Sequence, residues 1–323
     1  MNSGLVHAVQ LDGLGGAQTL SDLDKVTQLQ SQDKLIWLHF DYSHDETIEW
    51  LKSQHFIEEW EWQAMTMDAT RPRVAPAESG LLLFLRGVNL NPQQSPEDMV
   101  SIRCFVNEHI LITCRKRQLM SAQDILASLK AGKGPKNIAD LLSTLVQRLT
   151  ARMQDVIYQI DEQLDAFEDT LDNQEEHIDA NLLSTTRRQT IALKRYLKPQ
   201  KVAISELLEY QPDWLNDTAA RKLNEADNAL SRYVEELESA IERAQVIQHS
   251  LSNQLSEQLN QRMYVMSVVA ALFLPLGFLT GLLGVNIGGI PGTESPYAFA
   301  LFVTTLCLLT GSIGYYFRRK HWL

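Results

Sequence analysis

The sequence predicts an α+β membrane protein with an N-terminal cytoplasmic α/β domain, a long stalk helix continuous with a first transmembrane helix, and a second transmembrane helix. Two uncharged runs near the C-terminus, an apolar helical repeat leading into the first of them, and β-branched runs in the first third of the chain predict these parts. The expected segments are a cytoplasmic α/β domain (1–135), long cytoplasmic helices and stalk (136–262), first span (263–283), periplasmic loop (284–296), second span (297–317) and basic cytoplasmic tail (318–323).

The two spans are predicted from length and lack of charge. Residues 263–283 and 297–317 contain no charged side chain, and at about 1.5 Å per residue each is long enough to cross a hydrocarbon core of about 30 Å. Basic residues precede the first run and follow the second, and none lies between them. This distribution predicts that both termini are cytoplasmic, in a multi-pass protein of a bacterial inner membrane. Two core helices of a soluble protein would have to hide both runs on every face, which is disfavoured.

Upstream of the first span, apolar residues recur mostly at steps of three and four, and residues 218–271 contain no proline or glycine. One helix is therefore expected over residues 218–283, with about two thirds of it outside the membrane. Residues 137–171 and 178–210 are also expected to form long helices.

The first third of the chain carries β-branched and aromatic runs that predict strands at residues 5–11, 35–42, 80–88 and 100–114, the last folding back at residues 107–109. Cys104 and Cys114 then lie on strands, where packing is a more common role than metal ligation. An amphipathic segment at residues 46–53 separates two of these runs, which indicates an α/β arrangement.

Composition and motifs exclude several function classes. The formal net charge of −11 opposes nucleic-acid binding, and three scattered cysteines do not make a disulfide framework. Hydrolase, phosphate-loop, zinc-protease and dinucleotide motifs are absent from the sequence, so neither an enzyme nor a cofactor is expected. His44 beside Asp45, and His177 beside Glu175 and Glu176, are the histidines worth testing for cytoplasmic metal binding.

One face of the first span carries mostly small residues at alternating steps of three and four. The predicted pore-lining stripe is Asn260, Met263, Ser267, Ala270, Leu274, Gly277 and Gly281, and it continues to Gly284. Met266 joins the pore-lining set only through the family resemblance given below. Such a stripe can line a narrow pore or let membrane helices pack closely, and both readings are compatible with a bundle. The spans contain no Asp, Glu or His and a single Cys, so bare zinc has no ligand set there and an ion is expected to pass largely hydrated.

The motif Gly284-Val285-Asn286 directly follows the first span and precedes a Gly- and Pro-rich stretch. Here the sequence resembles the CorA family of divalent-metal transporters, which carry Gly-Met-Asn at this place, and more closely its ZntB branch, which carries Gly-Val-Asn. The resemblance extends over nearly the whole chain, including Thr70-Arg71-Pro72-Arg73-Val74 and the Leu-Pro-Leu of residues 274–276. Leu283 departs from the magnesium branch, which has Tyr before the motif, and this favours zinc over magnesium.

The resemblance implies a funnel-shaped homopentamer that transports zinc(II) as substrate, with cadmium, nickel and cobalt as further candidate divalent cations. It implies that Gly284, Val285 and Asn286 form the ion-selectivity mouth and that Met263 and Met266 form the cytoplasmic constriction. Glu294 is a candidate for attracting cations at the periplasmic mouth, although an exposed carboxylate is more often only solvated. Proton coupling is left open. The alternatives are a magnesium or cobalt channel of the CorA type and a membrane-tethered sensor or scaffold.

Overall fold

The computed structural model describes residues 4–20, 23, 26, 29, 32–68, 70–173, 178–284, 292 and 295–319. The chain divides into two compact units, Met1–Gln248 and His249–Leu323. Four of the candidate residues, Val285, Asn286, Glu294 and His177, lie outside the described residues, as do Glu175 and Glu176.

The larger unit contains a seven-stranded sheet with the order β2-β1-β3-β7-β6-β5-β4. Strands β3 and β7 pair in parallel, and the other neighbouring pairs are antiparallel. The turn between β6 and β7 is fixed by Asn107, whose Oδ1 accepts hydrogen bonds from the backbone N–H groups of His109 and Ile110, both at 3.0 Å. The strands are β1 Leu5–Leu11, β2 Ala17–Thr19, β3 Ile36–Asp41, β4 Arg73–Pro76, β5 Leu81–Gly87, β6 Val100–Val106 and β7 Ile110–Arg115.

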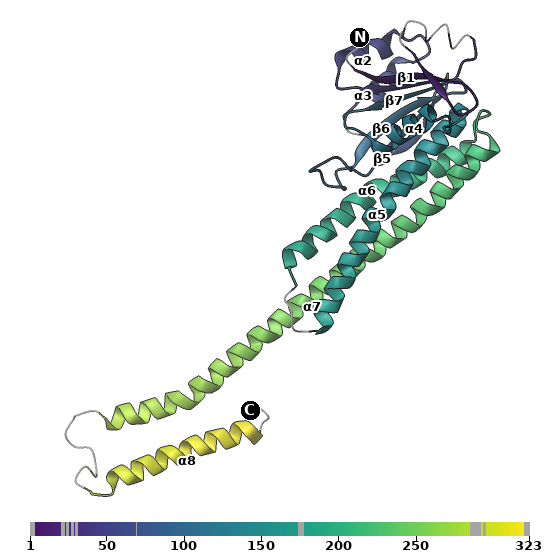
Figure 1. Cartoon of the computed structure of the whole chain (residues 1–323). Coiled ribbons are helices and arrows are strands. Elements are labelled where there is room, and N and C mark those ends of the chain that lie inside the picture. Colours follow the sequence, from purple (N-terminus) through teal and green to yellow (C-terminus); the bar gives the residue numbers. More distant parts are fainter. Residues whose placement is uncertain are drawn as a thin grey trace. The chain divides into compact units, whose positions relative to one another are not determined.

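Helices cover both faces of this sheet (Figure 1). The short helices α2 (Asp45–Ser53) and α3 (Glu59–Thr66) pack on the face that carries Phe40, while α4 (Met120–Lys130) and the long helices pack on the face that carries Trp37. Strand residues alternate between the two apolar cores because successive side chains point to opposite faces. The result is a three-layer α/β/α domain.

Both cysteines of this domain are free and buried, as expected for packing residues. Cys104 belongs to the core beneath the long helices and Cys114 to the opposite core. Burial raises the pKa of Cys114 to about 12, so its thiol is protonated at neutral pH.

The predicted long helices are confirmed as α5 (Ile138–Asn173), α6 (Ala180–Tyr210) and α7 (Asp217–Leu283). Helix α7 has 67 residues, which at about 1.5 Å per residue gives a length of roughly 100 Å. Its portion in the larger unit packs through Leu223, Leu230 and Leu237, which are fully buried in the core shared with α5 and α6. The heptad-like spacing therefore marks the buried seam of this helix.

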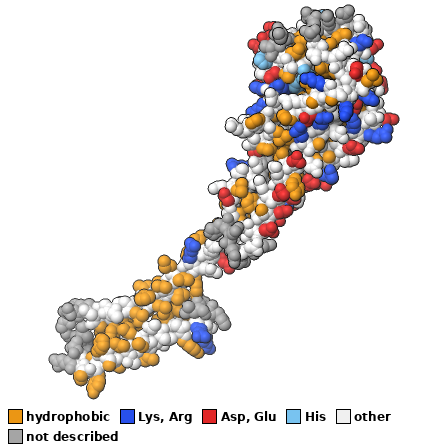
Figure 2. Space-filling model, in the orientation of Figure 1, with side chains coloured by type: hydrophobic (Ala, Val, Ile, Leu, Met, Phe, Trp, Pro, Cys, Tyr) orange, Lys and Arg blue, Asp and Glu red, His pale blue; other side chains and the backbone are white. Residues whose placement is uncertain are grey.

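The smaller unit consists of the C-terminal part of α7 and helix α8 (Ala298–Arg319). Both helices are long and apolar enough to cross a membrane, and almost none of either apolar window is buried within the chain. Apolar side chains gather over this unit, whereas charged side chains are spread over the larger one (Figure 2). Hydroxyl groups in the apolar helices donate to backbone carbonyls four residues earlier, as Ser267 does to Met263 O at 2.9 Å and Thr304 to Ala300 O at 2.8 Å. These bonds satisfy the hydroxyl protons without water.

A stacked pair of histidines lies on neighbouring strands of the larger unit. His7 and His39 face each other across β1 and β3 with ring centroids 4.8 Å apart, and His7 Nε2 is buried without a hydrogen-bond partner. Burial lowers the pKa of His7 from 6.5 to about 4, with Arg115 and Lys130 adding to the effect. Burial likewise lowers the pKa of His39 well below its usual value, with His7 and then Arg115 adding to the effect.

We expect the larger unit to lose stability as the pH falls from 6.5 towards 4. In this range His7 is protonated in the unfolded chain but stays neutral in the folded one, so protonation favours unfolding. The loss from His7 should reach about 3 kcal/mol and level off below pH 4. Denaturant unfolding followed by far-ultraviolet circular dichroism can measure this stability at each pH, because that signal does not depend on the Trp37 ring, whose centroid lies 4.3 Å from that of His7. His7→Gln should reduce the fall in the free energy of unfolding between pH 6.5 and 4. His44→Gln, a substitution at an exposed position, should leave that fall unchanged. The same pH dependence in wild type and both variants would show that His7 does not cause the loss of stability.

Candidate functional site

The eight predicted pore-lining residues all lie on exposed parts of α7 in the single chain: Asn260, Met263, Met266, Ser267, Ala270, Leu274, Gly277 and Gly281. The side chains of Met263, Met266 and Leu274 are 62%, 72% and 71% exposed. A side-chain carbon added at Gly277 or Gly281 would meet no atom within 4 Å. The stripe is therefore exposed in the single chain, as are most residues of this part of α7.

Helices α7 and α8 enclose a mostly apolar groove of about 630 Å³ that the sequence analysis missed. Phe273, Leu276, Gly277 and Thr280 line it from α7. Gly277 therefore stands at the border between the predicted stripe and this groove. From α8 the groove is lined by Leu306, Cys307, Thr310 and Gly311. The small residues Cys307 and Gly311 lie one helical turn apart, and this spacing in the sequence could have indicated a helix-packing face here.

Of the predicted mouth, the structure places Gly284, at the C-terminal end of α7, where its N–H donates to Thr280 O at 2.9 Å. A side-chain carbon at this position would lie 2.7 Å from the same carbonyl oxygen. Glycine permits this close approach, which explains why the motif begins with it. Val285, Asn286 and Glu294 fall outside the described residues, so their arrangement stays a prediction.

Several acidic side chains of α5 are engaged by one arginine of α7. Arg243 forms ion pairs with Asp161 at 2.6 Å, Asp165 at 2.5 Å and Glu168 at 2.6 Å. Hydrogen bonds from Arg243 to Glu168, and next to Asp165, raise the pKa of the guanidinium further above its usual range. These carboxylates thus help to hold α5 against α7, and they keep an excess of negative charge there.

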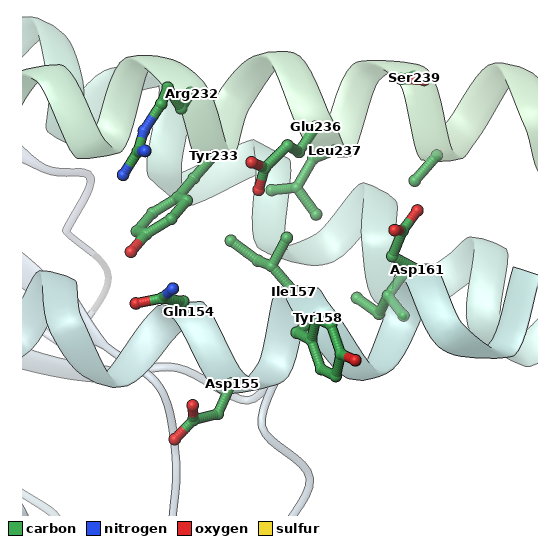
Figure 3. Close-up of a pocket in the computed structure, with 12 residues that line it drawn as sticks. Gln154, Asp155, Ile157, Tyr158, Asp161, Arg232, Tyr233, Glu236, Leu237 and Ser239 are labelled. Carbon is green, nitrogen blue, oxygen red and sulfur yellow. The ribbon is translucent and has the colours of Figure 1, made fainter.

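A cavity of about 350 Å³ lies beside this cluster, between α5 and α7 (Figure 3). Asp155 and Asp161 line it from α5, and Glu236 and Arg232 line it from α7. Because Asp161 is already paired with Arg243, Asp155 and Glu236 against the Arg232 guanidinium leave a small excess of negative charge, which favours cations over anions. Among the described residues, no group of three His, Cys, Asp or Glu side chains is placed to hold a metal ion, so this cavity offers no direct coordination site. His44 is exposed at the N-terminus of α2, and it belongs to no such group either.

Comparisons with known proteins agree with the fold and with the resemblance noted above. The family model described as CorA-like Mg2+ transporter protein matches residues 32–319. The chain is 39% identical over 327 residues to the divalent cation transporter CmaX of Pseudomonas aeruginosa, with 99% of this chain and 97% of that protein covered. It is 34% identical over 322 residues to the zinc transport protein ZntB of Pectobacterium carotovorum, with 100% and 97% covered.

A solved structure of full-length CmaX superposes with a TM-score of 0.86 at 38% identity, covering 100% of this chain and 99% of that one. The match includes the α/β domain, the long helix and the two apolar helices together. The resemblance seen in the motif, the spans and the stalk is thereby confirmed, and the chain belongs to the CorA family of divalent cation transporters.

Proposed function

We propose that this protein transports zinc(II) across the bacterial inner membrane as a funnel-shaped homopentamer with both termini in the cytoplasm. The observation that carries the proposal is the stripe of small residues along α7, which is exposed in the single chain and meets the groove beside α8 only at Gly277. A membrane helix commonly presents such a face to other helices or to water. Copies arranged around an axis would bring these faces together along one central pore.

Each predicted residue has a role in this proposal. At the mouth formed by Gly284, Val285 and Asn286, the Asn286 amide and backbone carbonyl oxygens would hold a hydrated dication through its water shell. Glu294 would attract cations from outside. Met263 and Met266 would close the cytoplasmic end as an apolar ring that excludes water. The expected division into a cytoplasmic part (1–262), a membrane hairpin (263–317) and a cytoplasmic tail (318–323) belongs to the same proposal.

The chemistry of the spans favours passage of the hydrated ion, since neither span contains an imidazole or carboxylate that could replace the water shell. The name of the ZntB relative supports zinc as the cargo, and that of CmaX supports a divalent cation. A magnesium or cobalt channel is the second candidate, favoured by the description of the family model. The two candidates share the fold and differ in selectivity.

Zinc flux into proteoliposomes loaded with a zinc-sensitive dye tests the proposal. We expect Asn286→Ala to lower zinc flux by about tenfold, as for loss of a hydrogen bond to a charged species. Ser295→Ala, in the same loop, should leave the flux unchanged. Excess magnesium should compete weakly, cadmium, nickel and cobalt should compete more strongly, and an imposed proton gradient will report coupling.

Light scattering of the purified protein should give a mass of five copies. Strong competition and uptake of magnesium in place of zinc would favour the second candidate. Absence of flux for every divalent ion from correctly assembled protein would contradict transport itself.

A further inference from the structure

A separate cavity of about 630 Å³ opens at one edge of the sheet in the larger unit. The parallel strands β3 and β7 end at this edge and lead into Tyr42 and Lys116, which line the cavity. Strand pairing brings Arg86 of β5 opposite Ser101 of β6 at the same edge, and both also line it. Crevices beyond the carboxyl ends of parallel strands are frequent ligand sites, and this volume suits a small metabolite.

The wall formed by the strand ends is basic. Arg86, Lys116 and Arg117 line the cavity directly. Arg103 lies behind this wall and is fully buried, with its guanidinium carbon 4.1 Å from the ring centroid of Tyr42. Among the described residues, neither Arg86 nor Arg103 forms an ion pair with a carboxylate. Arg86 is half-buried and Arg103 is fully buried. The carboxylate of Asp68, which lines the same cavity, interacts electrostatically with Arg103 but forms no direct ion pair with it.

The hydrogen bonding of the two arginines is incomplete. Arg86 donates to Met99 O at 2.9 Å and Thr70 O at 2.8 Å, but its buried Nε has no acceptor among the described residues. Arg103 donates through Nη2 to the carbonyl oxygens of Met67 and Asp68, while its buried Nε and Nη1 have none. Burial lowers the pKa of Arg86, and the positive charge of nearby Arg103 lowers it further by a smaller amount. Such a pair is stabilised by negative charge close by.

Carboxylates occupy the other parts of the rim. Asp68 pairs with Lys116 at 3.0 Å, and both side chains are largely exposed. Glu97 and Asp98, in the loop before β6, line the cavity from another side. A ligand that fits both kinds of wall carries a negative group for the basic side and hydroxyl donors for the carboxylates.

We propose that this cavity binds a small hydroxylated oxyanion, with its phosphate or carboxylate group on Arg86, Lys116 and Arg117 and its hydroxyl groups toward Glu97 and Asp98. Lys116 exchanges Asp68 for the ligand when the site is filled. The cavity lies wholly in the larger unit and involves none of the residues of the ion pathway. Its occupancy is therefore independent of which cation the protein transports.

Calorimetric titration of the full-length protein in detergent, at low ionic strength and in metal-free buffer, tests this site. The probes are ribose 5-phosphate and citrate, with inorganic phosphate and ribose to separate the contributions of the charge and the hydroxyl groups. Wild-type protein should bind ribose 5-phosphate, citrate or both, and more tightly than it binds phosphate or ribose. Tighter binding of the sugar phosphate identifies a phosphate ligand, and tighter binding of citrate identifies a carboxylate ligand.

The variant Lys116→Gln/Arg117→Gln should bind at least about tenfold more weakly, since two charged donors are lost at exposed positions that tolerate glutamine. The matched control, Lys133→Gln/Arg221→Gln, removes two exposed positive charges elsewhere in the same unit and should bind like wild type. Asp68→Asn should bind a few-fold more tightly, because it releases Lys116.

Failure of folded wild-type protein to bind any of the oxyanions would overturn the proposal. Equal weakening in both double variants would also overturn it, because binding would then follow net charge alone. Weaker binding by Asp68→Asn would contradict the proposed exchange, in which Lys116 leaves Asp68 to contact the ligand. None of these readouts depends on ion flux, so they leave the transport proposal untouched.

Discussion

Replacing Gly281 with phenylalanine is expected to reduce divalent-cation flux by about a hundredfold or more, because a ring of bulky apolar side chains would close a narrow pore and exclude its water. Gly281 lies near the end of α7 on the proposed pore face, and a side-chain carbon there would meet no atom within 4 Å in the single chain. The substitution should therefore spare the fold of each copy and act on the pathway that the copies share.

Gly314→Phe is the matched control. Gly314 lies in α8, and a side-chain carbon there would also meet no atom within 4 Å, but α8 is proposed to lie outside the pore helices. Both variants are reconstituted in liposomes, checked for their oligomeric mass and compared by dye-reported zinc and magnesium uptake. Normal flux through Gly281→Phe would place the pathway elsewhere, and equal loss in both variants would indicate a general packing defect.

Replacing Trp37 with alanine should destabilise the larger unit by about 3–5 kcal/mol, as expected for deletion of a fully buried aromatic side chain. Trp37 is fully buried on the sheet face beneath the long helices, and its Nε1 donates to Thr113 Oγ1 at 2.9 Å. The same hydroxyl lies 2.7 Å from His39 Nδ1 and donates to Leu38 O at 3.1 Å. The substitution leaves a cavity and also removes a donor from a buried polar network.

Trp60→Ala provides the comparison, since Trp60 is 43% exposed on α3 and its loss should cost below about 1 kcal/mol. Denaturant unfolding of the full chain, followed by far-ultraviolet circular dichroism, gives both values. A loss for Trp37→Ala no larger than that for Trp60→Ala would show that the central strands contribute little to the stability of this domain.

The sequence patterns predicted the long helices and the main strands because their signals are local and repeated. The buried seam of α7 appears as leucines at helical spacing. Strands β3, β5 and the β6–β7 hairpin appear as short apolar runs, β-branched and aromatic in β3 and the hairpin and rich in leucine in β5. The three-residue β2 and four-residue β4 were missed, because edge strands this short carry little periodic signal. The parallel pairing of β3 with β7 joins segments about 75 residues apart and was likewise not visible in any local pattern.

For the candidate site, sequence spacing predicts a face of small residues along α7, and these residues are exposed in the single chain, as are most others in this part of the helix. Local spacing could not show what faces that helix. The groove shared with α8 depends on the packing of two segments that each looked uniformly apolar. Arg243 has its carboxylate partners 75 to 82 positions away, and Gln200 accepts from the N–H of Arg86 114 positions away. Long-range polar pairs of this kind require the fold.

The hydrogen bond from the Ser267 hydroxyl to Met263 O within α7 also affects which hydrated ions this helix can contact favourably. Ser267 has one proton, and Met263 O receives it, so the serine oxygen offers only lone pairs to its surroundings. Water around a cation turns its oxygen inward and its hydrogens outward, whereas water around an anion does the reverse. If this face lines the pore as proposed, an acceptor-only oxygen there would match the outer surface of a hydrated cation and oppose that of a hydrated anion, which would discriminate between charges without any charged side chain.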